Sequence, residues 1–473
     1  MVEWLRGVMR QVCDVAMPRT TAARPRRAVY WWTEEIAQLR RTSVQARRTL
    51  SRLPRGKNME RREEALAAYR AARCALSAAI RKSRASCWDE LLTSLNTDPW
   101  GRAYKIVLNM YRVWAPPATE SLNPPVLNNV VDTLFPSVAE GSTLNWGLGL
   151  EGPHDIQEDE EISSDELRRA VKRVKSGKAP GPDGVPGKIW VQALDFLGEA
   201  FRRIYNECLK QGFFPQQWKQ AKLVLLPKKG KKAGNPSAYR PICLLDEVGK
   251  IFERIIASQL VQHLSRNGDL HEEQYGFRGG RSTVDAIKRV RFLTEAAVKE
   301  GGVAIAISLD IANAFNTLSW DGVEDALKRH GVPTYLVEII KQYFRDRSLE
   351  FVTQDGLQCR REIRCGVPQG SVLGPLLWNL AYNRVLCLPL PRGCHSICYA
   401  DDTLVVAAGD CWGEVVAKAE IAVEAVVQCV TGMGLKVAAS KTEVLGFYGR
   451  ASEKPPPETR IRVGGPQSWQ ETD

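Results

Sequence analysis

The chain lacks any hydrophobic run approaching the ~20 residues that a membrane-spanning helix needs. Its first residues, Met1–Arg6, also lack the regions of a signal peptide. The twelve cysteines show no paired spacing, and Cys394, His395 and Cys398 match no known zinc module. No internal repeat of solenoid period is present. These absences argue against membrane, secreted and repeat proteins, and they predict an intracellular protein of the nucleus or the cytoplasm.

The charge is unbalanced toward the positive side. Lys and Arg number 66 against 54 for Asp and Glu, a net charge of +12. Such an excess fits a polyanionic partner, with nucleic acid as the first candidate, or a solvated basic surface. Apolar residues make up 44% of the 473 residues, which is typical of a globular chain with a substantial core.

Composition divides the chain into three parts. Residues 1–112 read as a basic helical extension, residues 113–160 as a linker rich in Pro and acidic residues, and residues 161–473 as a mixed region. In the extension, a long helix over Met59–Leu95 carries a series of basic residues from Arg61 to Arg84. Two interpretations stay open for this helix: an amphipathic helix with a solvated face, or a nucleic-acid-binding helix.

The mixed region alternates helices and strands irregularly. Ser163 and Glu166 predict a capping box at the start of a helix. Further patterns predict strands at Lys222–Leu226 and Val303–Leu309, and helices at Val248–Leu264, Ser282–Lys299, Trp320–His330 and Tyr335–Phe344. Because this order is not a regular βαβ alternation, the fold class expected is α+β.

Three carboxylates end or join apolar runs that read as buried strands. Asp310 follows Val303–Leu309, and Asp401 and Asp402 sit between two apolar segments. Carboxylates in such positions must face solvent, a cation or a metal. A sheet that holds Asp310 beside Asp401 forms an oxygen-rich site for hard divalent cations, with two Mg²⁺ ions expected and Mn²⁺ as the alternative. Such a site suits phosphoryl transfer by two metal ions.

Six sequence blocks occur in order between Lys175 and Phe447. They are Lys178–Pro186, Leu225–Gly230 with Tyr239–Ile242, Gln274–Arg278, Ser308–Phe315, Gly366–Pro375 and Tyr399–Asp402. In content and order they resemble the reverse transcriptases of non-LTR retrotransposons, most of all the arthropod-type clades that carry an apurinic-type endonuclease. The resemblance implies a right-hand polymerase fold with fingers and palm, and an RNA-directed DNA polymerase. Its implied partners are an RNA template, a DNA primer or target and a dNTP.

The resemblance also implies a role for each matching residue. The implied catalytic residues are Asp310, Asp401, Asp402 and Lys441, and the implied metal ligands are Asp310, Asp401, Asp402 and the backbone of Ile311. Nucleotide contacts are expected from Lys228, Arg240, Ile311, Phe315, Gln369 and Gly370, and template contacts from Tyr275, Phe277, Arg278 and Arg281. Fixed cations neutralise a triphosphate, and aromatic rings stack on bases. Arg240, in an apolar setting, is harder to explain as a surface residue.

The resemblance further implies a fragment. Tyr30–Thr33 and Asp98–Lys105 resemble the two ends of the spacer after an endonuclease, and Ile461–Gly465 resembles the approach to a primer-grip hairpin. On this interpretation the endonuclease and the thumb are missing. Two alternatives remain: a group II intron maturase-like enzyme or RNA polymerase, which Phe315 opposes, and a catalytically silent nucleic-acid-binding remnant.

Overall fold

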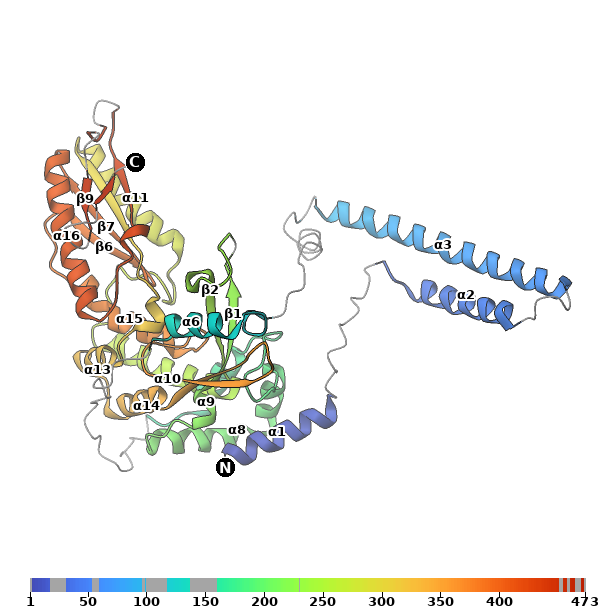
Figure 1. The fold of residues 1–473 in the computed structure, drawn as a ribbon. Coiled ribbons are helices and arrows are strands. Elements are labelled where there is room, and N and C mark those ends of the chain that lie inside the picture. Colours follow the sequence, from blue (N-terminus) through green and yellow to red (C-terminus); the bar gives the residue numbers. More distant parts are fainter. Residues whose placement is uncertain are drawn as a thin grey trace. The chain divides into compact units, whose positions relative to one another are not determined.

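A computed structural model describes residues 2–17, 31–52, 59–95, 98, 117–136, 160–228, 230–450, 454–456, 460–463 and 469–471. The chain divides into two units (Figure 1). The first contains residues 1–17 and 116–473, and the second contains residues 18–115. No helix in the described ranges is long and apolar enough to cross a membrane.

One sheet of the first unit has the strand order β6-β7-β3-β8 and carries the blocks that the resemblance assigns to the palm, so it is called the palm sheet below. Its strands are β3 (Val303–Leu309), β6 (Cys394–Tyr399), β7 (Asp402–Gly409) and β8 (Glu443–Phe447). All neighbouring pairs are antiparallel. Side chains alternate between its two faces, as the period of a strand requires.

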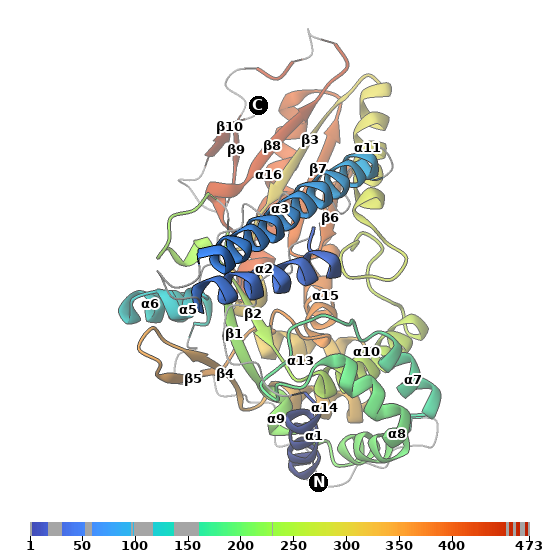
Figure 2. The same cartoon turned by 90° about the vertical axis from the view of Figure 1, so that its right-hand side faces the viewer.

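Helices cover both faces of the palm sheet. Ile305 and Ile307 of β3 belong to the main core, which also contains the buried side of α16 (Trp412–Gly432). Ala306 of β3 faces the other way and joins a smaller cluster with Val290 and Leu293 of α11 (Thr283–Lys299). Figure 2 shows the sheet with α11 along one side. The sheet is therefore fixed from both sides, and its strand ends carry the candidate site.

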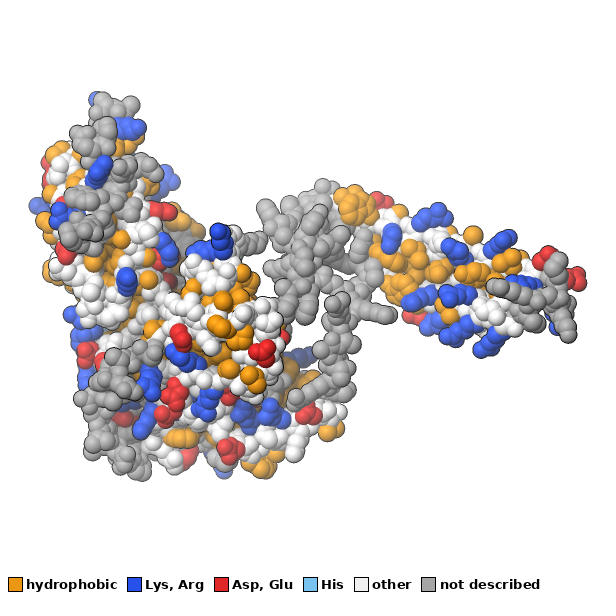
Figure 3. Space-filling view, viewed as in Figure 1, with side chains coloured by type: hydrophobic (Ala, Val, Ile, Leu, Met, Phe, Trp, Pro, Cys, Tyr) orange, Lys and Arg blue, Asp and Glu red, His pale blue; other side chains and the backbone are white. Residues whose placement is uncertain are grey.

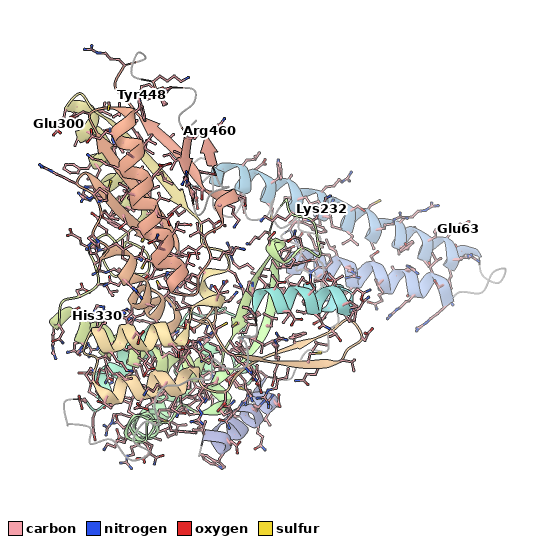
Figure 4. All side chains as sticks on the ribbon, turned by 60° about the vertical axis from the view of Figure 1, so that its left-hand side comes forward. Glu63, Lys232, Glu300, His330, Tyr448 and Arg460 are labelled. Carbon is pink, nitrogen blue, oxygen red and sulfur yellow. The ribbon has the colours of Figure 1, made fainter. Side chains whose placement is uncertain are left out.

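The other four-stranded sheet has the order β2-β1-β4-β5 and carries the block that the resemblance assigns to the fingers, so it is called the fingers sheet below. Its strands are β1 (Gln220–Pro227), β2 (Tyr239–Leu244), β4 (Arg347–Val352) and β5 (Gln358–Ile363). β1 and β2 form an antiparallel hairpin, β1 and β4 run parallel, and the single-turn helix η1 (Pro236–Ala238) leads into β2. Figure 4 shows Lys232 at the tip of this hairpin.

Helices surround the two sheets and complete the core. They are α7 (Ser164–Lys172), α8 (Gly187–Lys210), α9 (Gln216–Lys219), α10 (Glu247–Arg266), α12 (Ala314–Thr317), α13 (Trp320–Arg329), α14 (Thr334–Phe344) and α15 (Leu373–Leu386). The chain continues through η2 (Ala439–Lys441), β9 (Arg460–Arg462) and β10 (Trp469–Glu471), and β9 and β10 pair with each other. This mixed architecture confirms the expected α+β class.

Local sequence signals explain where several helices begin. The predicted capping box of α7 is confirmed, because Ser163 accepts from the Glu166 amide while the Glu166 side chain accepts from the Ser163 amide. Ser282 and Asp285 form the same arrangement at the start of α11. These caps satisfy amides that have no partner inside the helix.

Part of the predicted linker over residues 113–160 is instead folded. Residues 117–136 contain α5 (Ala118–Ser121) and α6 (Pro124–Leu134). Leu127, Val130, Val131 and Leu134 of α6 are buried in the main core. Pro124 and Pro125, two of the prolines that suggested a linker, occupy the first positions of α6, where the missing amide costs nothing. Apart from Glu160, the rest of the predicted linker lies outside the described residues.

The first helix, α1 (Val2–Ala16), belongs to the first unit. Leu5 and Met9 join the main core, and Arg6 forms a 3.6 Å ion pair with Asp246. The predicted extension over residues 1–112 is thus divided, because residues 1–17 belong to the first unit.

Where it is described, the second unit consists mainly of α2 (Glu34–Arg52) and α3 (Met59–Leu95), which pack against each other. Leu66, Tyr69, Leu76 and Ile80 of α3 are half-buried. Figure 3 shows Lys and Arg side chains on both sides of an apolar band on this unit. The predicted spacer ends at Tyr30 and at Pro99–Lys105 lie outside the described residues.

Candidate active site

Two segments of the palm sheet bring three carboxylates together at one end. β3 ends at Leu309, which pairs with Thr403 of β7. Asp310 is the next residue after Leu309, and Asp402 is the first residue of β7. Asp401 lies in the turn between β6 and β7. The antiparallel register therefore places Asp310 beside the turn that carries Asp401 and Asp402.

The carboxylates repel one another electrostatically. Burial raises the pKa of Asp401, and the charges of Asp402 and Asp310 raise it further. Burial also raises the pKa of Asp402, again with a contribution from Asp310. A divalent cation relieves both effects, because it replaces lost hydration and screens the repulsion between the carboxylates. The donor set thus fits hard cations.

Lys441 lies at the same site and contacts Asp310 directly. Its Nζ donates to Oδ2 of Asp310 over 2.8 Å. Across the described part of the chain, no three His, Cys, Asp or Glu side chains, these carboxylates included, are grouped so that they alone could hold a metal ion. Mg²⁺ is usually held by one or two carboxylates together with substrate phosphates, so a complete protein cage is not required.

The backbone around Asp310 is held by the segment that leads to Lys441. The Asp310 carbonyl accepts from the Ala438 amide over 2.8 Å, and the Ala312 amide donates to the Lys436 carbonyl over 2.8 Å. Ile311 forms an isolated β-bridge with Val437, and its side chain is buried. This anchoring explains how Lys441, remote in sequence, reaches Asp310.

The fingers contribute positive charge near these carboxylates. Burial lowers the pKa of Lys228, and the charges of Lys231, Arg240 and Lys441 lower it further. The Arg240 charge in turn lowers the pKa of Asp401, against the effect of burial. Arg240 therefore lies close enough to Asp401 to act on the pKa of that carboxylate. Asp310 in turn lies close enough to Lys228 to raise the pKa of that lysine against the effect of burial.

The expectation that Arg240 is not a surface residue is wrong. β2 alternates, with Tyr239, Pro241 and Cys243 buried while the Arg240 side chain is exposed. The neighbouring apolar residues suggested burial, but the period of a strand turns Arg240 outward. An exposed cation is available to a ligand.

Phe315 sits in a row of aromatic rings. Its ring centroid lies 5.1 Å from that of Trp378 and 5.9 Å from that of Phe277. Phe277 adopts a positive φ of 56° and is 56% exposed. The Phe315 side chain is half-buried, so one side of the row remains accessible.

The loop with Gln369 and Gly370 is fixed to the fingers sheet. The Cys243 amide donates to the Gln369 carbonyl over 2.7 Å. Gly370 has a φ of 129°, and a Cβ there would lie 2.4 Å from the Cys243 carbonyl oxygen. Only glycine fits this approach, so the loop is held against β2.

The cations predicted to bind template make contacts within the chain. Arg278 donates to the carbonyls of Leu270 and His271 and pairs with Asp269 over 2.6 Å. Arg281 donates to the Glu272 carbonyl and lies 5.3 Å from the ring centroid of Tyr275. Template binding by these residues stays a prediction.

Sequence reasoning did not single out Gln274 and Trp378. Both side chains are buried and both hydrogen bond to Ala400, in the turn that carries Asp401. Gln274 lies inside one of the six blocks, and its polar side chain two positions before Gly276 was the available signal. Trp378 lies within an apolar helix, where a core residue is the natural interpretation.

Comparison with known proteins supports the resemblance. Residues 226–460 match the family model described as reverse transcriptase (RNA-dependent DNA polymerase). The chain is 30% identical over 425 residues to the Pol polyprotein of the type-1 retrotransposable element R1 of Bradysia coprophila, covering 86% of this chain and 40% of that protein. It is also 32% identical over 262 residues to the probable RNA-directed DNA polymerase of transposon BS of Drosophila melanogaster, covering 54% and 28%.

A third relative is the RNA-directed DNA polymerase of the mobile element jockey of Drosophila melanogaster. It is 31% identical over 255 residues, which cover 52% of this chain and 27% of that protein. The chain thus spans less than half the length of each of these three relatives.

Proposed function

Residues 226–460 belong to the reverse transcriptase family, and from this premise we propose that the chain is an RNA-directed DNA polymerase of a non-LTR retrotransposon. The reaction is attack of a primer 3′-hydroxyl on the α-phosphate of a dNTP, with pyrophosphate leaving. The observation that carries the proposal is the convergence of Asp310, Asp401 and Asp402 at one end of the palm sheet.

Asp310, Asp401 and Asp402, with the Ile311 carbonyl, would hold two divalent cations, and Mg²⁺ is the expected ion. When bound, these ions favour the deprotonated 3′-hydroxyl and neutralise charge on the phosphates. Lys441 contacts Asp310 at 2.8 Å and would donate a proton to the leaving pyrophosphate.

Arg240 and Lys228 would bind the triphosphate from the fingers side. The Arg240 side chain is exposed and its charge acts on Asp401. Phe315 would pack under the sugar and exclude a 2′-hydroxyl, and the loop of Gln369 and Gly370 would contact the nucleotide or the template. These assignments rest on the geometry above and on the block that each residue occupies.

Template contacts are proposed for Tyr275, Phe277, Arg278 and Arg281. The exposed ring of Phe277 suits stacking on a base, and it lies beside Phe315. Arg278 and Arg281 would keep their hydrogen bonds within the chain and so hold this segment in place. Their positive charges would at the same time attract the template phosphates.

We assign a second nucleic-acid contact to α2 and α3. From Ile36 to Arg52, α2 contains five arginines and no acidic residue. Arg40, Arg48 and Arg52 line one depression together with the half-exposed Trp32. Arginines beside an aromatic ring suit single-stranded nucleic acid, because phosphates pair with the guanidinium groups and a base stacks on the ring.

Primer extension on poly(rA)/oligo(dT) with Mg²⁺ tests the proposal against its alternatives. We expect incorporation of dTTP and strong rejection of UTP. Preferred use of UTP would favour an RNA polymerase. A folded chain that binds primer–template without extending it would favour the silent remnant.

A further inference from the structure

The turn between β6 and β7 contains a strained residue. Ala400 precedes Asp401 and has a φ of +60°, in the left-handed region. A residue with a side chain pays about 1–2 kcal/mol to adopt this conformation. Such strain persists only where the surroundings impose it, and it gathers at functional sites.

Two buried side chains bind both backbone polar groups of Ala400. The Ala400 amide donates to Oε1 of Gln274 over 3.1 Å. The Ala400 carbonyl accepts from Nε1 of Trp378 over 3.1 Å and from Nε2 of Gln274 over 3.5 Å. Gln274 is 1% exposed and Trp378 fully buried, so neither bond competes with water.

The position of Gln274 is itself fixed by its neighbours. Its Oε1 also accepts from the Gly276 amide over 3.0 Å. A Cβ at Gly276 would lie 2.1 Å from the Ala400 nitrogen, so the two backbones touch. The Tyr275 amide donates to the Cys398 carbonyl over 2.8 Å, and the Cys398 amide donates to the Glu273 carbonyl over 2.9 Å. The segment thus lies against the end of β6.

Trp378 connects the turn to the aromatic row. Its ring stacks on Tyr382 at 5.1 Å and lies 5.1 Å from Phe315. The hydroxyls of Tyr382 and Thr403 are hydrogen bonded over 2.7 Å, which ties the same helix to β7 beyond Asp402. A shift of Trp378 would therefore act on both sides of the carboxylate turn.

We propose that Gln274 and Trp378 are positioning residues that hold Ala400 in its left-handed conformation and so aim Asp401 at the position of the metal. The assignment rests on the proposed polymerase function. Neither side chain reaches the reacting atoms. Each acts through the Ala400 backbone, as residues outside a ligand set orient the ligands themselves.

Two single substitutions in the full chain test the assignment. Gln274→Met keeps the length of the side chain and removes its bonds to Ala400. Trp378→Phe keeps an aromatic ring against Phe315 and removes the indole N–H. We expect each to raise the Kd for Mn²⁺, measured by calorimetry, by about tenfold to a hundredfold. The kcat for primer extension should fall while the KM for dNTP changes little, because neither side chain contacts the nucleotide.

Two matched variants separate this role from general packing. Trp190→Phe removes an equally buried indole N–H, which bonds to Asp183 in the fingers, and should leave Mn²⁺ affinity unchanged. Gln259→Met removes a buried amide of α10, which bonds to the Glu160 carbonyl, and should likewise leave Mn²⁺ affinity unchanged. Gln274 and Trp378 bond to Ala400 independently. If one variant unfolds below the assay temperature, the other therefore still tests the positioning role.

Mn²⁺ affinity and kcat equal to the wild type in the folded variants would overturn the positioning role and leave the polymerase function standing. A wild-type chain that binds Mn²⁺ but extends no primer would overturn the polymerase function instead. The comparison of Mn²⁺ affinities would then still decide whether Gln274 and Trp378 position Asp401.

Discussion

At the scale of single residues, the Phe315 ring packs on Trp378 and Phe277, and we propose that it also lies under the sugar of the nucleotide. Phe315→Val should open the volume that a 2′-hydroxyl requires. We expect discrimination against ribonucleotides to fall by on the order of tenfold or more. Competitive incorporation of dTTP and UTP measures this change.

Phe351→Val provides the control for Phe315→Val, because Phe351 is a buried ring of the fingers sheet. It should lower thermal stability, as a new cavity does, without changing sugar selection. Equal discrimination in Phe315→Val and wild type would show that Phe315 is only a core residue.

Arg240 is exposed, and its removal should affect ligand binding more than folding. Arg240→Ala should raise the KM for dNTP about tenfold or more, since a charge-assisted hydrogen bond contributes about 1.5–3 kcal/mol. Template affinity and the melting temperature should change little. Steady-state kinetics with varied dNTP checks the prediction.

The matched variant is Arg360→Ala, which removes an exposed arginine from β5, at the opposite edge of the same sheet. It should leave the KM unchanged. A lowered melting temperature with an unchanged KM in Arg240→Ala would assign Arg240 a structural role.

Sequence patterns identified the residues whose chemistry is conspicuous, and they missed those that act through the backbone. Asp310 and Asp401 stand out because carboxylates interrupt apolar runs. The partnership of Lys441 with Asp310 depends on the bridge between Ile311 and Val437, which no local pattern encodes. Gln274 and Trp378 reach Ala400 over long sequence separations, so only the folded chain reveals them.

At the scale of elements, α1 is joined to the core through a pair of buried carboxylates. The Asp183 amide donates to Oδ1 of Asp246 over 2.9 Å, and Arg6 pairs with Asp246. Arg10 donates to the Asp183 carbonyl over 3.2 Å. Burial, and then the charge of Asp183, raise the pKa of Asp246 to about 7.

This raised pKa predicts a pH-dependent stability. Between an unfolded pKa of 3.8 and a folded pKa of about 7, the folded chain retains a proton that the unfolded chain releases. The stabilisation from Asp246 is therefore fully present below 3.8 and is lost as pH rises through about 7. Asp246→Asn should remove this loss, which melting curves from acid to neutral pH would reveal.

Asp195→Asn is the control for Asp246→Asn, because Asp195 is an exposed carboxylate on α8. Its melting curve should follow the wild type at every pH. If the melting temperatures of the wild type and of Asp246→Asn changed with pH in the same way, Asp246 would not be protonated in the folded chain.

The sequence predicts the ends of an element well where a clear hydrophobic period or a helix cap marks them. α3, α10, α11 and β3 lie close to their predicted ranges. The sequence did not predict α6, because its prolines suggested a linker although proline is also common at the start of a helix. The packing of its apolar face against the main core is a tertiary contact. The isolated pairing of Gln274 with Cys398 is a tertiary contact and has no local signature.

At the scale of the whole molecule, the arginines of α2 predict salt-sensitive binding of single-stranded RNA. Replacing Arg40, Arg48 and Arg52 together with Gln should weaken binding and flatten its salt dependence. Each lost phosphate contact should reduce the log–log slope by about 0.7. Filter binding of the full chain over a salt series measures that slope.

Replacing Arg168, Arg169 and Lys172 of α7 with Gln is the control for charge alone, since it removes the same three charges from exposed residues of the first unit. It should leave the slope nearly unchanged. An equal change in both variants would mean that net charge, and not the surface of α2, governs binding.

The division of the chain into units could be predicted only in part. The basic composition marks the region that contains α2 and α3, but the packing of α1 with the first unit depends on Leu5, Met9 and Arg6 meeting distant partners. The composition of a segment does not show which distant residues its side chains will contact, so it could not assign α1 to the first unit.

The central claim is that Asp310 and Asp401 act as one catalytic unit, and primer extension by four chains tests it most directly. These are the wild type, Asp310→Asn, Asp401→Asn and the double variant. Because both carboxylates would hold the same ions, each single variant should lose as much kcat as the double variant, several orders of magnitude in all. Substantial extension by either single variant, or losses that multiply in the double variant, would contradict a shared site.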